Sequence, residues 1–144
     1  MMKKENIWDC REVTMLNKSL PKILADNCFD RVPTNDKVWV LKIPVNKMLL
    51  SQLDWQFDIP FWKYKQKKYA ITPNQVLNNK RKYAYQYRRI KNANLKFPID
   101  IAKNKNGRWE IIDGLHRLVK AKMLGLTVVS VRKISLAQFK KLLK

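Results

Sequence analysis

The sequence is poor in the residues from which metal sites and disulfides are built. Its 144 residues include two cysteines, Cys10 and Cys28, and one histidine, His116. The cysteines match no metal-binding or redox spacing, which favours buried or incidental thiols in a reducing compartment over a disulfide. We therefore expect no metal site made of cysteine and histidine.

Long apolar runs are also missing. No stretch approaches the roughly 20 residues of a transmembrane helix, and residues 1–6 lack the apolar character of a signal peptide. Hydrophobic residues still make up 46% of the chain, which argues against wholesale disorder. These features predict a soluble, cytoplasmic protein without a membrane partner.

Acidic residues are scarce, because 11 Asp and Glu oppose 31 Lys and Arg and leave a net charge of +20. No acidic residue lies between Asp58 and Asp100. A solvated lysine-rich surface is one interpretation, but so much uncompensated charge opposes the compact state. A polyanionic partner is favoured, most commonly nucleic acid, although an acidic protein or anionic lipid fits the same charge. The candidate nucleic-acid-binding residues are Lys80, Arg81, Lys82, Arg88, Arg89 and Lys91.

Glycine is rare too, and each of the three glycines falls at an expected turn. Residues 97–102 and 108–112 read as strands joined by an Asn-Gly hairpin. A helix follows Gly114 and ends at Gly125, and residues 126–132 form another strand. A Ser/Gln capping box at Ser135 opens a last helix.

The first half of the chain is less regular. Residues 1–35 are interpreted as an accessory arm that contains a short helix near residues 19–25, and residues 36–144 as the domain. The first main strand of this domain is predicted over residues 38–45. Residues 47–70 are aromatic-rich and read either as a loop that plugs the core or as a lid over a ligand. Helices are expected from the capping box at Thr72 and along Tyr83, Tyr87 and Ile90, where the tyrosines either face the core or stack on bases.

The turn between strand and helix at residues 113–117 is the candidate phosphate site. A helix start offers free backbone N–H groups and the positive end of the helix dipole. Arginine adds a planar fork suited to phosphate oxygens. The predicted phosphate- or nucleotide-binding residues are Gly114, Leu115, His116, Arg117 and Lys120.

Four residues are candidates for catalysis. Asp113 either caps the helix or acts as a base, in which case it implies a bridging Mg²⁺ or a hydroxyl substrate. His116 lies in the same turn. Asp54 and Asp58 are the carboxylates nearest to the most basic segment, although they also read as solvated loop residues.

The same residues carry a family resemblance. The run Pro98–Ile101, the hairpin, the segment Ile111–Ala121, Leu124-Gly125 and the strand Val128–Arg132 resemble the ParB/sulfiredoxin-like superfamily, and in particular ParB-like nuclease-domain proteins. The turn is most similar to the free-serine-kinase branch, whose Asp-Gly-His-His-Arg differs here at Leu115. The resemblance implies a small α/β (α+β) fold with a mixed sheet, and a hairpin-turn-helix-strand unit flanked by helices.

The resemblance also bears on function. Its members bind nucleotide phosphates at the loop before this helix, which implies a nucleoside di- or triphosphate, with Mg²⁺, as ligand. Leu115 stands where sulfiredoxin has its reactive cysteine, which argues against peroxiredoxin repair. Leu115 and His116 also replace the Glu and first Arg of the Gly-Glu-Arg-Arg turn of ParB partition proteins, which argues against centromere clamping.

Two functions remain from the sequence. The first is a phosphate-binding domain that holds nucleic acid through the basic surface and the Asp-Gly-X-His-Arg turn. The alternative is a nucleotide-dependent enzyme, either a phosphotransferase or a nuclease, that uses the same turn.

Overall fold

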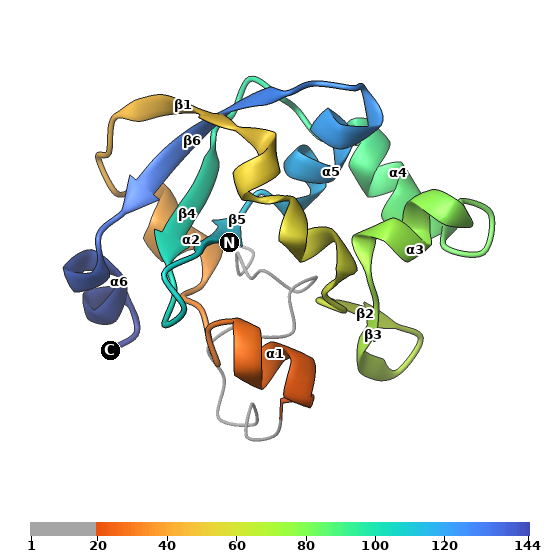
Figure 1. The fold of residues 1–144 in the computed structure, drawn as a ribbon, viewed down its shortest axis with the longest axis horizontal. Coiled ribbons are helices and arrows are strands. Elements are labelled where there is room, and N and C mark those ends of the chain that lie inside the picture. The colour runs from red at the N-terminus through yellow and green to blue at the C-terminus, as the bar shows by residue number, and fades with distance from the viewer. Residues whose placement is uncertain (1–19) are drawn as a thin grey trace.

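A computed structural model describes residues 20–144 of the chain (Figure 1). Its centre is a mixed four-stranded sheet in the order β1-β6-β4-β5. β6 runs antiparallel to β1 and parallel to β4, and β4 runs antiparallel to β5. The strands are β1 (Val45–Leu49), β4 (Ile99–Lys103), β5 (Trp109–Asp113) and β6 (Val128–Ile134).

Both faces of this sheet are covered. One face, which includes Ile101 and Ile111, belongs to the larger core cluster with the buried residues of α5. The other face, which includes Ala102 and Ile112, packs with Phe139 of α6. The remaining elements are α1 (Lys22–Asn27), α2 (Asn35–Trp39), η1 (Leu50–Gln52), η2 (Asp54–Asp58), β2 (Trp62–Tyr64), β3 (Lys67–Ile71), α3 (Pro73–Asn78), α4 (Ala84–Asn92), α5 (Leu115–Met123) and α6 (Leu136–Leu142). The predicted fold class is confirmed.

Local signals place the elements of the second half where the sequence predicts them. The capping boxes at Thr72 and Ser135 both form, with each side chain accepting a hydrogen bond from the N3 amide. The Asn-Gly hairpin joins β4 to β5, and Gly107 adopts a φ of 74° that favours glycine. The hairpin, the turn, α5 and β6 therefore form the expected unit.

The strand predicted over residues 38–45 is wrong. Residues 35–39 form helix α2, and β1 starts only at Val45. Two features disfavour a strand here. Pro44 has no N–H to donate to a neighbouring strand. The Arg132 guanidinium donates hydrogen bonds to the carbonyls of Val38 and Leu41, at 3.1 and 2.7 Å, so these carbonyls are not used in a sheet. A tertiary contact thus outweighs the strand propensity of the β-branched residues in this segment.

The aromatic segment 47–70 plugs the core. Phe57, Phe61 and Trp62 are among the largest fully buried side chains. Gln56 is buried beside edge strand β5, where its amide accepts from the Ile111 N–H at 2.8 Å and donates to the Trp109 carbonyl at 3.3 Å. The segment therefore covers the open edge of the sheet.

Residues 20–35, which the sequence assigns to an accessory arm, pack against the rest of the protein. Leu24 and Cys28 belong to the larger core cluster, and the side chain of Cys28 is buried. The buried Glu110 carboxylate accepts from the Phe29 N–H at 3.0 and 3.1 Å. Cys10 and the expected N-cap Ser19 lie outside the described residues. The boundary at residue 36 stays a prediction.

Within residues 20–144, no helix has the length and apolar character needed to cross a bilayer.

The Glu110 contact gives a test of how firmly α1 is attached. Glu110→Ala leaves the Phe29 amide without its acceptor, which should lower the free energy of unfolding by about 1–3 kcal/mol. Urea unfolding measures this loss, and limited proteolysis should cut near residues 20–35 faster. Glu110→Gln, which keeps an acceptor oxygen, is the control. Equal stability of the alanine variant and the wild type would show that the contact does not hold α1.

Candidate functional site

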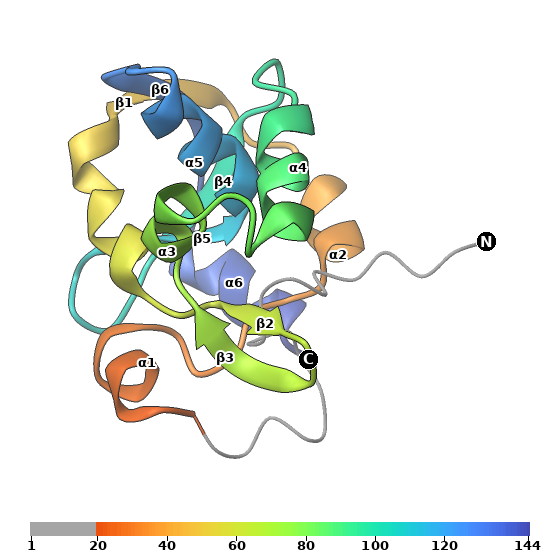
Figure 2. The same cartoon turned by 90° about the vertical axis from the view of Figure 1, so that its right-hand side faces the viewer.

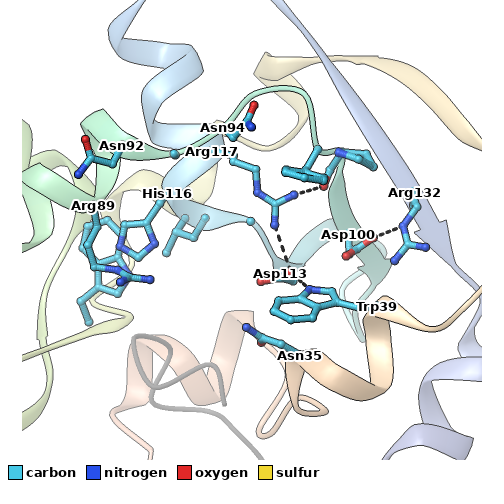
Figure 3. A pocket seen from close by; sticks show the side chains of 16 residues that line it. Asn35, Trp39, Arg89, Asn92, Asn94, Asp100, Asp113, His116, Arg117 and Arg132 are labelled. Atoms are coloured by element: carbon cyan, nitrogen blue, oxygen red, sulfur yellow. Dashed lines mark hydrogen bonds and ion pairs between the residues drawn. The ribbon is translucent and has the colours of Figure 1, made fainter. Parts of the chain in front are cut away.

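A cavity of about 880 Å³ lies where β5 turns into α5. Its wall comes from α2, the end of α4, the connection 93–98 and the turn at residues 113–117 (Figure 3). Segments far apart in the sequence therefore converge on the turn that the sequence singles out.

A row of charged residues crosses three adjacent strands at this cavity. Arg132 of β6 pairs in register with Asp100 of β4, and Asp100 pairs in register with Asp113 of β5. The Arg132 Nε donates to the Asp100 carboxylate at 2.5 Å. Burial raises the pKa of Asp100, which the hydrogen bond and charge of Arg132 oppose. The row is thus a set of buried charges held in pairs.

Arg117 completes the row from the first turn of α5. Its Nη2 lies 3.1 Å from the Asp113 Oδ2, and its Nη1 donates to the Pro98 carbonyl. A Cβ at position 114 would meet this guanidinium at 3.2 Å, and Gly114 also has a φ of 107°. Gly114 therefore makes room for the arginine and for the turn itself.

The start of α5 has no side-chain cap. Gly114 is the N-cap, and Asp113, expected as one possible cap, instead accepts from the Trp39 indole N–H at 2.6 Å and from Arg117. Gly114, Leu115 and His116 all line the cavity. The nine-residue helix α5 therefore starts at the cavity wall, and no side chain among the described residues caps it.

His116 lies on a different part of the wall from the Arg117–Asp113 pair (Figure 3). Its ring stacks on Trp62 with centroids 4.7 Å apart, and its Nε2 is 2.7 Å from the Gln86 Oε1. Because that oxygen only accepts, Nε2 carries the proton in the neutral ring. Burial first, and then the charges of Arg89 and Arg117, lower the pKa of His116 to about 3. The imidazole is fixed and neutral at pH 7.

Rings and amides form much of the remaining wall. Trp39 is 48% exposed and Phe97 is 62% exposed, and both line the cavity. Asn92 and Asn94 stand at the end of α4 and just after it (Figure 3). Such a wall offers stacking surfaces and paired hydrogen-bond donors and acceptors.

The other predicted site residues, except Arg89, do not line this cavity. Lys120 donates hydrogen bonds to the carbonyls of Lys91 and Ala93 at 2.8 Å each, so its ammonium caps the C-terminal end of α4. Asp54 and Asp58 belong to η2 and do not line the cavity, and Asp58 accepts from Asn74 at 2.7 Å. Of the basic residues on or before α4, Arg89 lines the cavity. Contact of any of these residues with a ligand stays a prediction.

Sequence reasoning did not select Asp100, Arg132 or Trp39. A signal existed for the first two, because each is a charged residue within an apolar strand run, and such residues are buried only when paired. Trp39 gave no signal, since its role depends on α2 replacing the expected strand.

Asp100 and Asp113 are the carboxylates available to a metal at this cavity. Each is already paired with an arginine, and a nearby guanidinium opposes the binding of a cation. No group of three or more histidine, cysteine or acidic side chains suited to a metal occurs among the described residues. The geometry does not fit Mg²⁺ held by the protein itself.

Two solved structures are similar to this chain, and both have the ParB/sulfiredoxin-like fold. The C-terminally truncated chromosome-partitioning protein ParB from Caulobacter crescentus, complexed with CTP-gamma-S, is 16% identical with a TM-score of 0.40, over 69% of this chain and 50% of that one. Sulfiredoxin from Arabidopsis thaliana is 17% identical with a TM-score of 0.34, over 70% of this chain and 98% of that one. The chain thus spans half the length of the matched ParB chain. No protein-family model and no curated protein matches the sequence.

The low pKa of His116 predicts a pH dependence of stability. In the unfolded state His116 is protonated below its ordinary pKa of 6.5, whereas in the folded state it stays neutral down to about pH 3. Stability should therefore fall as pH falls through this window, by at most about 1.4 kcal/mol per pH unit from this residue. Urea unfolding between pH 7.5 and 5 measures the slope.

His116→Gln removes the titrating ring and is the matched comparison. Its unfolding free energy should decline less steeply with falling pH than that of the wild type. Parallel slopes for the two proteins would contradict the assignment of a buried neutral imidazole.

Proposed function

We propose that the cavity binds a nucleotide, with its phosphates at the start of α5 and its base against the ring-lined wall. The observation that carries this proposal is the combination of uncapped helix amides with arginines in one cavity. Helix N-termini bind phosphates because their amides and dipole both favour an anion. A nucleoside di- or triphosphate is the chemical class that this cavity fits.

The charge of the cavity supports an anionic ligand. Among the described residues that line the cavity, the three arginines Arg89, Arg117 and Arg132 outnumber Asp100 and Asp113 by one charge when His116 is neutral. Arg117 uses two of its five N–H donors in the contacts with Pro98 and Asp113. Its remaining donors are available to phosphate oxygens while the ion pair fixes the side chain.

The geometry supports binding more than catalysis. The Asp113 Oδ2 already accepts two hydrogen bonds, from Trp39 and Arg117. A histidine with a pKa of about 3 is a weak base at neutral pH. Asp54 and Asp58 lie outside the cavity wall. The chain's own residues therefore hold and orient a ligand here, and an enzymatic role is not part of the proposal.

A second candidate function is the binding of nucleic acid by the basic surface of α4 and the turn before it. Lys80, Arg81, Lys82, Arg88 and Lys91 are all exposed, and none makes a described ion pair with a carboxylate. Arg88 lies over the exposed Tyr85 ring at 5.9 Å, and Lys91 over Tyr87 at 5.7 Å. This surface needs no cavity, since phosphate backbones bind exposed cations.

Nucleotide binding is tested by thermal unfolding with 1 mM of each common ribonucleoside triphosphate and of the matching nucleosides. At least one triphosphate should raise the melting temperature, and its nucleoside should do so far less, because the phosphates supply most of the binding energy. Arg117→Lys keeps the charge but removes the planar fork, so it should weaken binding by roughly tenfold or more in calorimetric titration.

Lys140→Gln, on exposed α6, is the charge-matched control and should bind as the wild type does. Arg89→Gln removes a second cavity cation without touching the Arg117–Asp113 pair and should also weaken binding. No stabilisation by any triphosphate, or equal affinity of all variants, would overturn the proposal.

Nucleic-acid binding is tested by fluorescence anisotropy at several salt concentrations. The combined change Arg88→Gln and Lys91→Gln should weaken binding, and should reduce the slope of log affinity against log salt by about 0.7–0.9 for each phosphate that is no longer neutralised. Lys140→Gln with Lys141→Gln is the control for net charge. If the control lowers affinity equally, the binding is not specific to α4.

A further inference from the structure

A second depression lies apart from the cavity and shares no lining residue with it. It is an open groove of about 720 Å³ between the β2–β3 hairpin and the segment that leads into α4. The hairpin extends beside α3 in both views of the molecule (Figures 1 and 2). Its polar and aromatic lining consists of Tyr64, Lys65, Gln66, Lys67, Lys82 and Tyr83.

Two tyrosine rings are among the side chains that line this groove. Tyr64 and Tyr83 meet edge to face, with centroids 5.0 Å apart and planes at 80°. Both are partly buried and pack against the larger core cluster, so their positions are fixed by the fold. The two rings therefore line an open groove at fixed positions, one from strand β2 and one from the N-cap of α4.

Lysines lie beside these rings, and no acidic residue is among the described residues that line the groove. The Lys65 ammonium lies 5.5 Å from the Tyr64 ring centre, and the Lys82 ammonium lies 5.4 Å from that of Tyr83. Lys67 is exposed on the opposite strand of the hairpin. Rings with adjacent flexible cations are the elements that bind the bases and phosphates of a single strand.

The backbone of the hairpin supports a role for Lys65. Tyr64 and Lys67 pair directly, so Lys65 and Gln66 form a two-residue turn. Lys65 has a φ of 55°, in the left-handed region where glycine is preferred at such turns. A non-glycine residue in this conformation is uncommon. Here it places a cation over a ring at the groove.

We propose that this groove binds single-stranded nucleic acid, with bases stacked on Tyr64 and Tyr83 and phosphates contacting Lys65, Lys67 and Lys82. The bases of a duplex are stacked on each other and cannot reach these ring faces. Lys82 joins the groove to the basic surface of α4, so a bound strand continues onto that surface. The inference rests on the nucleic-acid-binding candidate above and assigns it a strand type and a stacking site.

The test measures affinity for a fluorescein-labelled 12-nucleotide oligo-dT by anisotropy, with the full chain, at four salt concentrations. Tyr64→Ala and Tyr83→Ala should each lower affinity by roughly fivefold or more, with the salt slope unchanged, because a stacking contact releases no counterions. Tyr64→Phe and Tyr83→Phe keep the ring and should stay within about twofold of the wild type.

Because both tyrosines pack against the core, a second variant avoids them. Lys65→Gln with Lys67→Gln changes exposed side chains and should lower both the affinity and the salt slope, whereas Lys140→Gln with Lys141→Gln should leave the slope nearer to that of the wild type. Circular dichroism melting shows which variants remain folded. A 12-base-pair duplex should compete less well than unlabelled oligo-dT at equal phosphate concentration.

The failures are distinguishable. If oligo-dT binds but the folded tyrosine variants and the groove lysine variant match the wild type, the groove inference is wrong and the α4 candidate stands. If the duplex or polyglutamate competes as well as oligo-dT, binding is by charge alone and the inference is overturned. If no nucleic acid binds, both fail, while nucleotide protection of the cavity is read separately by thermal unfolding.

Discussion

The buried ion pair between Asp100 and Arg132 fixes the region that forms the proposed nucleotide site. It joins β4 to β6 at one end of the sheet, and its guanidinium also binds two carbonyls of residues 38–41. Those bonds hold α2 against the sheet, and α2 carries the Trp39 indole to Asp113. Asp113 in turn holds Arg117. Removing one partner of such a pair leaves an uncompensated buried charge, which is far more costly than the pair itself.

This chain of contacts explains how a cavity with several arginines stays open and ordered. Each of the two carboxylates neutralises one guanidinium and orients it, and a third arginine, Arg89, also lines the cavity. His116 contributes shape and a hydrogen bond with Gln86 rather than charge, because its environment keeps the ring neutral. A preorganised site of this kind binds an anion without first ordering its side chains.

The large positive charge of the protein is divided between two kinds of surface. In the cavity, Arg117 and Arg132 are paired and partly buried, which suits a small ligand of defined shape. On α4 and along the β2–β3 groove they are exposed and lie beside tyrosine rings. Exposed cations act over a long range and are weakened by salt. The two surfaces therefore suit a nucleotide and a polymer of nucleotides, respectively.

The sequence alone determined the elements whose signals are local. The Asn-Gly hairpin, the capping boxes at Thr72 and Ser135, and the glycine turn before α5 depend on interactions within a few residues, and they formed as predicted. Tertiary structure decided the rest. Residues 35–39 form a helix, and Arg132, more than 90 positions away, binds the carbonyls of Val38 in this helix and of Leu41 just after it. It also decided that Arg117 faces Asp113 and that His116 stacks on Trp62, since these choices depend on burial and on charges that only folding brings together.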